Sequence, residues 1–282
     1  MGLKSKVHHA VGHLVARWNK KYYYEDFVRV YPGEKRWDIF GRQKKAKPND
    51  INNYKNHVKS YRFAAQFVAG KSVLDVGCGA GYGCKIFLDA GAQSVSGTDL
   101  SEHALAYAEE QYGDVVDFKN QSVTDMAEYA DNSFDLSTSF EVLEHVKEYG
   151  KEAEMLTEMK RVTKPGGLVV IATPNCELLG DHGFWHAEIE ELFSTHFSEH
   201  ALFENALVPN GPGRLQWEER KKAGQLATVV SEDINIKEIV WHAETPPEVK
   251  QGIEPGAFPF SDLEIDTRLL HNTHGWMVVA RI

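Results

Sequence analysis

The stretch VLDVGCGAGYG, residues 73–83, decides the fold of this chain. A short apolar run leads into three alternating glycines, and residues 84–90 continue with helical character. This order predicts a buried strand, a tight turn and a helix, because glycine lets the backbone turn sharply and lets a ligand approach closely. The free N–H groups at the start of such a helix favour a carboxylate. We therefore expect a ligand site at the carboxyl end of this strand.

Strand-like and helix-like segments alternate around this stretch. Apolar runs predict further strands at 94–98, 115–120, 134–140 and 168–172. Helical spacing predicts helices at 53–69, 102–112, 141–146 and 153–162. Strands that alternate with helices form a parallel sheet with both faces covered, so the predicted fold class is α/β.

The same pattern divides the chain into four parts. Residues 1–54 form an N-terminal extension that we interpret as a lid or substrate arm, and residues 55–208 form the core. Residues 209–273 hold Gly, Pro and charged stretches with a short strand near 227–230, and we interpret them as an insertion that covers the active site. The apolar run within 274–282 predicts a final core strand.

The glycine spacing argues against a dinucleotide site. Gly77, Gly79 and Gly81 follow a G-x-G-x-G pattern, whereas the dinucleotide fingerprint is G-x-G-x-x-G. Asp75 precedes the turn, where a carboxylate would repel a pyrophosphate but would suit the ammonium group of an amino acid. Asp99 ends the next strand, where a carboxylate can accept hydrogen bonds from both ribose hydroxyls. These features disfavour a nicotinamide dehydrogenase.

Four motifs together carry a resemblance to a known family. They are VLDVGCGAGYG (73–83), GTDLS (97–101), FDLSTSFEVLEHV (134–146) and RVTKPGGLVVIATPN (161–175). In this order they resemble the motifs of class I S-adenosylmethionine-dependent methyltransferases of the type 11, ubiquinone-pathway O-methyltransferase-like group. The resemblance covers about residues 55–205. It implies a Rossmann-like fold with a seven-stranded, mostly parallel sheet, helices on both faces, and S-adenosylmethionine as the methyl donor.

The resemblance assigns cofactor contacts by position, from the methionine end to the adenine. At the methionine end and near the methyl group it places Asp75, Gly77, Gly79, Gly81, Phe140 and Glu141. At the ribose hydroxyls it places Asp99, and at the adenine Leu100, Thr124 and Asp125. It also counts Tyr61 among the cofactor contacts and places Tyr82 at the rim.

Alternatives remain for some of these positions. Asp99 and Asp125 could simply cap the helices that follow them, and Tyr82 could be a core aromatic. Similar enzymes carry a His-x-x-Arg-Tyr pattern ahead of the glycine turn. This chain has Ser60 in place of that arginine, which removes a cation expected beside the cofactor carboxylate.

The segment Glu141-Val142-Leu143-Glu144-His145 is expected at the reacting centre. On a helix, residues i, i+3 and i+4 share a face, so Glu141, Glu144 and His145 would point the same way. They resemble the E-x-x-E-H cluster that holds a divalent metal in ubiquinone-pathway O-methyltransferases and small-RNA 2′-O-methyltransferases. His182 or His186 would be a further ligand, and such ligands suit Mg, Mn, Fe or Zn.

The same residues also fit a site without a metal. Either His145 or His186 would then act as a general base, with Glu141 lining the cofactor pocket. In a third interpretation the protein only holds the acceptor in line with the methyl group.

Charge and cysteine content narrow the partners and the compartment. The first 60 residues carry 14 basic and 5 acidic residues, and the remainder carries 17 basic and 36 acidic residues. The acidic remainder disfavours a broad nucleic-acid interface, which needs clustered Lys and Arg. The three cysteines form no disulfide or zinc pattern, and no apolar run approaches the ~20 residues of a membrane span. We therefore expect a cytoplasmic protein.

The sequence as a whole predicts an S-adenosylmethionine-dependent methyltransferase that acts on a small molecule, with oxygen as the favoured acceptor atom. Two other functions remain open, a metal-dependent RNA 2′-O-methyltransferase and a non-catalytic S-adenosylmethionine-binding protein. Each of these three functions is compatible with a homo-oligomer.

Overall fold

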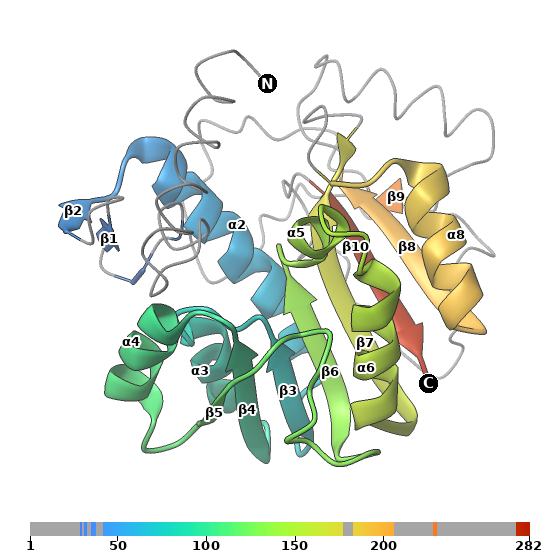
Figure 1. The fold of residues 1–282 in the computed structure, drawn as a ribbon, viewed down its shortest axis with the longest axis horizontal. Helices are drawn as coiled ribbons and strands as arrows, with labels where there is room; N and C mark the ends of the chain where they lie inside the picture. Colours follow the sequence, from blue (N-terminus) through green and yellow to red (C-terminus); the bar gives the residue numbers. More distant parts are fainter. Residues whose placement is uncertain are drawn as a thin grey trace.

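The computed structural model describes residues 29, 31–32, 35–37, 42–176, 183–205, 228–229 and 275–282. Within these ranges one large sheet carries helices on both faces (Figure 1). Its strands are β3 (Ser72–Val76), β4 (Ser94–Asp99), β5 (Asp117–Asn120), β6 (Phe134–Phe140), β7 (Thr163–Pro174), β8 (Glu199–Asn205), β9 (Thr228–Val229) and β10 (Gly275–Arg281). A separate antiparallel pair is formed by β1 (Lys35–Trp37) and β2 (Gln43–Lys45).

The large sheet has the strand order β5-β4-β3-β6-β7-β10-β8-β9. The strands β5, β4, β3, β6 and β7 are parallel to one another, and β10 runs antiparallel between β7 and β8. The predicted final strand is therefore confirmed, and it lies inside the sheet rather than at its edge. The two-residue β9 extends the expected seven strands at the β8 edge. The predicted Rossmann-like, mostly parallel sheet is confirmed.

Two layers of helices cover the sheet because successive strand residues point to opposite faces. Val73 belongs to the apolar cluster under α2 (Pro48–Ala65), α3 (Tyr82–Asp89) and α4 (Glu102–Tyr112). Leu74 belongs to the cluster under α5 (Leu143–Lys147), α6 (Glu152–Val162) and α8 (His186–His196). Among the described helices, none has both the length and the apolar character needed to cross a bilayer.

The division of the chain into parts differs in detail from the expectation. Helix α2 begins at Pro48, five residues before the predicted start at residue 53, because proline is well tolerated in the first turn of a helix. The expected boundary after residue 54 therefore falls inside a core helix. Of the insertion 209–273 only β9 lies in the described ranges, so its place over the active site remains a prediction.

Candidate functional site

The glycine turn lies at the carboxyl end of β3, where β4 and β6 also end. Gly77 and Gly79 have φ angles of 80° and 55°, a region that side chains rarely adopt. A Cβ on Gly77 would also lie 2.4 Å from a methyl carbon of Val142. The N–H groups of Gly77 and Cys78 donate to the Thr98 carbonyl at 2.7 and 2.9 Å, which fixes the turn to β4. The predicted strand, turn and helix are all present.

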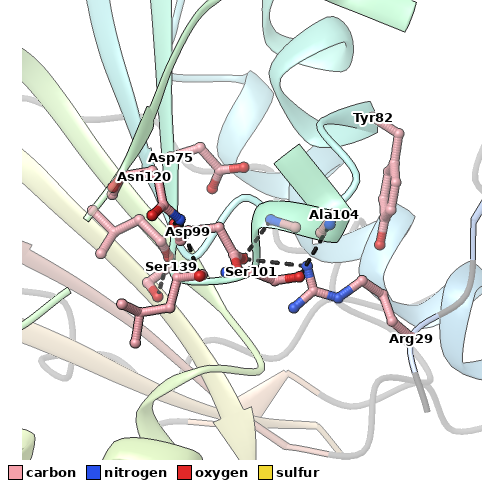
Figure 2. Close-up of polar contacts among 12 residues, drawn as sticks. Arg29, Asp75, Tyr82, Asp99, Ser101, Ala104, Asn120 and Ser139 are labelled. Carbon is pink, nitrogen blue, oxygen red and sulfur yellow. Dashed lines mark hydrogen bonds and ion pairs between the residues drawn. The ribbon is translucent and has the colours of Figure 1, made fainter. Parts of the chain in front are cut away.

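Asp99 ends β4 beside this turn, and it is almost completely buried. Its Oδ2 accepts from the Gly79 N–H at 2.8 Å, and its Oδ1 accepts from the Ser101 N–H at 2.9 Å. Asn120 donates to the backbone carbonyls of Asp99 and Leu100, both at 3.0 Å (Figure 2). The cap of α4 is made by the Ser101 hydroxyl, which accepts from the Ala104 N–H at 3.0 Å. Asp99 is therefore not the helix cap, and its carboxylate is held at the carboxyl end of β4, where its contact with a ribose stays a prediction.

Asp75 lies on β3, one residue before the strand ends, and has no exposed surface. It accepts hydrogen bonds from the Tyr61 hydroxyl at 2.9 Å and the Thr138 hydroxyl at 3.0 Å. Burial raises the pKa of Asp75 to about 7, even though these hydrogen bonds act to lower it. Through these hydrogen bonds Asp75 links α2 and β6 to the end of β3, next to the glycine turn. Its contact with a ligand ammonium remains a prediction.

Aromatic side chains line the α2 side of the turn. The Tyr82 ring packs edge-on against Tyr54 and Tyr61, with ring centres 4.9 and 5.6 Å apart. The Tyr61 ring also contacts Phe140, at 4.7 Å between centres, so the predicted rim and methyl-side residues meet in one cluster. His57 Nδ1 lies 3.0 Å from the Tyr82 hydroxyl. Burial, with a smaller contribution from the positive charge of Arg29, lowers the pKa of His57 to about 4, so this imidazole is neutral at pH 7.

The predicted adenine residues differ in exposure, and Thr124 is partly buried. Leu100 is exposed, and so is Asp125, which begins no helix in the described chain. This excludes helix capping by Asp125. Thr124 is tied to Ser122, with 2.8 Å between the two hydroxyl oxygens.

Two residues of α6 clamp the peptide that follows Asp125. Glu158 accepts from the Met126 N–H at 2.7 Å, and Arg161 donates to the Met126 carbonyl at 3.0 Å. The Arg161 guanidinium also donates to the Tyr129 carbonyl at 2.9 Å. The turn that presents Asp125 is therefore anchored from both sides.

The backbone turn at Glu141, directly after β6, contradicts the predicted helical cluster. Glu141 has a φ angle of 58°, and its N–H donates to the Ala172 carbonyl at 2.9 Å. Helix α5 begins only at Leu143, so Glu141 lies outside it. The prediction that Glu141, Glu144 and His145 share one helical face is therefore wrong, because the left-handed residue turns the chain before the helix starts.

The two carboxyl groups of this corner lie close to one another, with Glu144 buried and Glu141 partly buried. Glu144 accepts from the Thr173 hydroxyl at 2.9 Å, and its Oε1 lies 3.8 Å from His145 Nε2. Burial raises the pKa of Glu144 to about 8. Burial, and then the negative charge of Glu144, raises the pKa of Glu141 well above its usual range. Both carboxyl groups therefore keep their protons to a higher pH than an exposed glutamate does.

The predicted metal site is not assembled in the part of the chain that the structure describes. No three His, Cys, Asp or Glu side chains gather there in a way that could hold an ion. Glu141 is separated from the helical face, and Glu144 is engaged by Thr173. His182 lies outside the described residues, and His186 is placed only as the first residue of α8.

Three residues near the turn were not singled out by the sequence. Arg29, Tyr54 and Asn120 all contact residues of the predicted cofactor site. Arg29 lies 70 positions from Asp99 in the chain and belongs to no motif, so no local pattern could have revealed it. Asn120 at the end of β5 could have been found, since polar residues at the carboxyl ends of parallel strands meet at one edge.

Comparison with known proteins identifies the family of this core. Residues 74–171 match the family model of a methyltransferase domain. The chain carries a methyltransferase domain. This match spans the glycine turn, β4 with Asp99, and the corner at Glu141.

Curated relatives agree with this assignment. The chain is 37% identical over 143 residues to a ubiquinone biosynthesis O-methyltransferase of Pseudomonas paraeruginosa, covering 49% of this chain and 57% of that protein. It is 33% identical over 122 residues to an S-adenosylmethionine-dependent methyltransferase of Mycolicibacterium smegmatis, covering 43% and 45%. The aligned part thus spans about half the length of these relatives.

One solved structure supports the fold beyond the core motifs. It is a chain of the complex between the Haloferax volcanii Trm112 methyltransferase activator and a methyltransferase, with a TM-score of 0.50. The match covers 83% of this chain and 92% of that chain at 19% identity, so it bears on the fold alone.

Proposed function

We propose that this protein transfers the methyl group of S-adenosylmethionine to a hydroxyl group of a small molecule. The observation that carries the proposal is Asp99, a carboxylate held by backbone N–H groups at the end of β4 beside a turn of left-handed glycines. A ribose with two hydroxyl donors suits that acceptor. The identities to O-methyltransferases of the ubiquinone pathway support oxygen as the acceptor atom.

The residues present fit this cofactor. Gly77 and Gly79 give the turn its left-handed backbone, and Asp99 and the exposed Leu100 and Asp125 follow one another along the strand ends. When bound, S-adenosylmethionine supplies a methyl group on a positively charged sulfur. The chain's own part is to fix the ligand along this edge and to hold an acceptor in line with the methyl group.

The corner at Glu141 and Glu144 supplies the acid–base chemistry of the proposal. A hydroxyl acceptor must lose a proton, and a base works best when its pKa lies near the working pH. Burial brings the pKa of Glu144 to about 8, far closer to neutrality than that of an exposed glutamate. His145, with its Nε2 3.8 Å from the Glu144 carboxylate, can pass a proton to it, and His186 remains an alternative base.

A small-molecule acceptor fits the charge of the chain better than RNA does. Beyond residue 60 the chain carries 36 acidic and 17 basic residues, which opposes the contacts to many phosphates that RNA binding requires. An S-adenosylmethionine-binding protein without turnover is the other outcome that the experiment below separates.

Calorimetric titration of the full chain with S-adenosylhomocysteine, with and without EDTA, is the first test. Micromolar binding that survives EDTA is expected. Transfer of labelled methyl from S-adenosylmethionine to a panel of phenols and catechols, with a structured RNA in parallel, then tests the acceptor. Binding without transfer to any acceptor would favour the non-catalytic alternative, and transfer to RNA alone would contradict the small-molecule proposal. The absence of binding to folded protein would overturn the function altogether.

A further inference from the structure

Arg29, far upstream in the chain, lies beside Asp99, the residue proposed to bind the cofactor ribose. Arg29 Nη1 lies 3.3 Å from Asp99 Oδ2, the oxygen that also accepts from the Gly79 N–H. Both side chains are largely removed from solvent, with exposed fractions of 19% for Arg29 and 9% for Asp99. Figure 2 shows the Arg29 side chain reaching toward Asp99 from the same side as Tyr82.

The guanidinium lies against the glycine that leaves room for a ligand. A Cβ on Gly79 would fall 2.9 Å from Arg29 Nη1 and 3.4 Å from its Cζ. The space that the missing side chain leaves is therefore taken up by Arg29. A ligand that lies along this turn needs the same space.

Packing on α4 holds this part of the chain in place. Tyr31 is completely buried, and its ring packs edge-on against Tyr107 at 4.9 Å and against His103 at 6.2 Å between ring centres. Arg29 is two residues away, so its reach toward Asp99 starts from an anchored position.

We propose that Arg29 is an internal competitor for Asp99, and that a ribose must displace it to bind. This inference rests on the proposed function, since it takes Asp99 as the ribose acceptor. Of the three donors that the described residues give Asp99, two are backbone N–H groups fixed by the fold, and only Arg29 can leave. Arg29 thereby sets the affinity for the cofactor.

The size of the effect follows from the population of the ion pair. When a site is open in only a fraction of the molecules, the apparent Kd rises by the inverse of that fraction. An Arg29–Asp99 ion pair that forms in most molecules therefore weakens ligand binding about 3- to 10-fold. Removing the guanidinium should therefore recover this roughly 3- to 10-fold loss of affinity, although the variant makes no new contact with the ligand.

The test is the sign of the affinity change on removing Arg29. S-adenosylhomocysteine is titrated calorimetrically into the full-length wild type, Arg29→Ala, Arg29→Gln and the control Arg62→Ala, which removes an exposed arginine at the end of α2. Both Arg29 variants are expected to bind about 3- to 10-fold more tightly than the wild type. Arg62→Ala is expected to match the wild type. Unchanged or weaker binding in both Arg29 variants would overturn the inference, and weaker binding would instead make Arg29 a cofactor ligand.

A double-mutant cycle ties the effect to Asp99. On an Asp99→Asn background the carboxylate no longer attracts Arg29, so Arg29→Ala is expected to bring almost no gain in affinity. A gain as large as in the wild type would show that Arg29 acts elsewhere, and it would overturn the inference. Wild-type binding without a gain in the Arg29 variants refutes this inference alone, whereas no binding in any variant refutes the proposed function as well.

Discussion

The same three strands, β3, β6 and β7, treat carboxyl groups in opposite ways at their two ends. At the amino ends Asp135 accepts from Lys164 at 2.7 Å and from the Ser72 hydroxyl at 2.7 Å. Burial alone would raise the pKa of Asp135, but these hydrogen bonds and the Lys164 charge lower it to about 2. This carboxylate is charged, paired and partly open to solvent.

At the carboxyl ends Asp75 and Glu144 are buried, and each accepts a hydrogen bond from at least one hydroxyl group. Asp75 is bonded by Tyr61 and Thr138, and Glu144 by Thr173. Burial raises the pKa of Asp75 to about 7 and that of Glu144 to about 8. Groups with strongly shifted pKa values gather at functional sites. We therefore interpret the carboxyl ends as the ligand-binding end of the sheet and the ion pair at the amino ends as a stabilising contact.

The largest effect should appear in the pH dependence of stability. Because the folded pKa of Glu144 lies above its ordinary value of 4.5, the folded protein holds more protons between about pH 5 and pH 8. Stability is therefore greatest at the low end of this window and falls as pH rises, by about 1 kcal/mol per pH unit from this group. In Glu144→Gln that fall should become shallower by the same amount.

Urea unfolding of the wild type and Glu144→Gln at pH 5, 6, 7 and 8 measures these slopes. Glu154→Gln, which changes an exposed glutamate on α6, should keep the wild-type slope. An equal slope in Glu144→Gln would mean that Glu144 titrates normally, and the contrast between the two ends would weaken.

The next effect is on ligand binding at the carboxyl ends. Asp99→Asn should weaken binding of S-adenosylhomocysteine about 10- to 100-fold, because a hydrogen bond to a charged acceptor is worth about 1.5–3 kcal/mol. Calorimetry measures the change, and Asp89→Asn on the exposed end of α3 serves as the control. Unchanged affinity in Asp99→Asn would place the ribose elsewhere.

The smallest effect is expected at the amino ends. Asp135→Asn should lower the free energy of unfolding by about 0.5–1 kcal/mol at pH 7, since the pair with Lys164 is screened by solvent. The folded pKa of Asp135 is depressed to about 2, so this contribution is present above about pH 4 and is lost as pH falls toward 2. Urea unfolding at pH 7, 4 and 3 follows it. Binding of S-adenosylhomocysteine should not change, and a loss of affinity with full stability would contradict the division between the ends.

Local sequence determined the fold and which side chains lie at the carboxyl edge of the sheet. The glycines at 77, 79 and 81, Asp99 and the alternation of strands and helices are local patterns, and their consequences are local geometry. Parallel strands bring their carboxyl ends to one edge, so the sequence alone was enough to expect Asp75, Asp99 and Glu141 near one another.

Tertiary structure decided the backbone conformation, the burial and the hydrogen-bond partners of those residues. The left-handed backbone at Glu141 depends on its bond to β7, so helical spacing misjudged the cluster with Glu144 and His145. The burial that raises the pKa of Glu144 comes from strands and helices far apart in the chain. The pairing of Arg29 with Asp99 joins residues 70 positions apart, and such a contact leaves no periodic trace in a sequence. Sequence thus set which groups reach the edge, and packing set their charge and their partners.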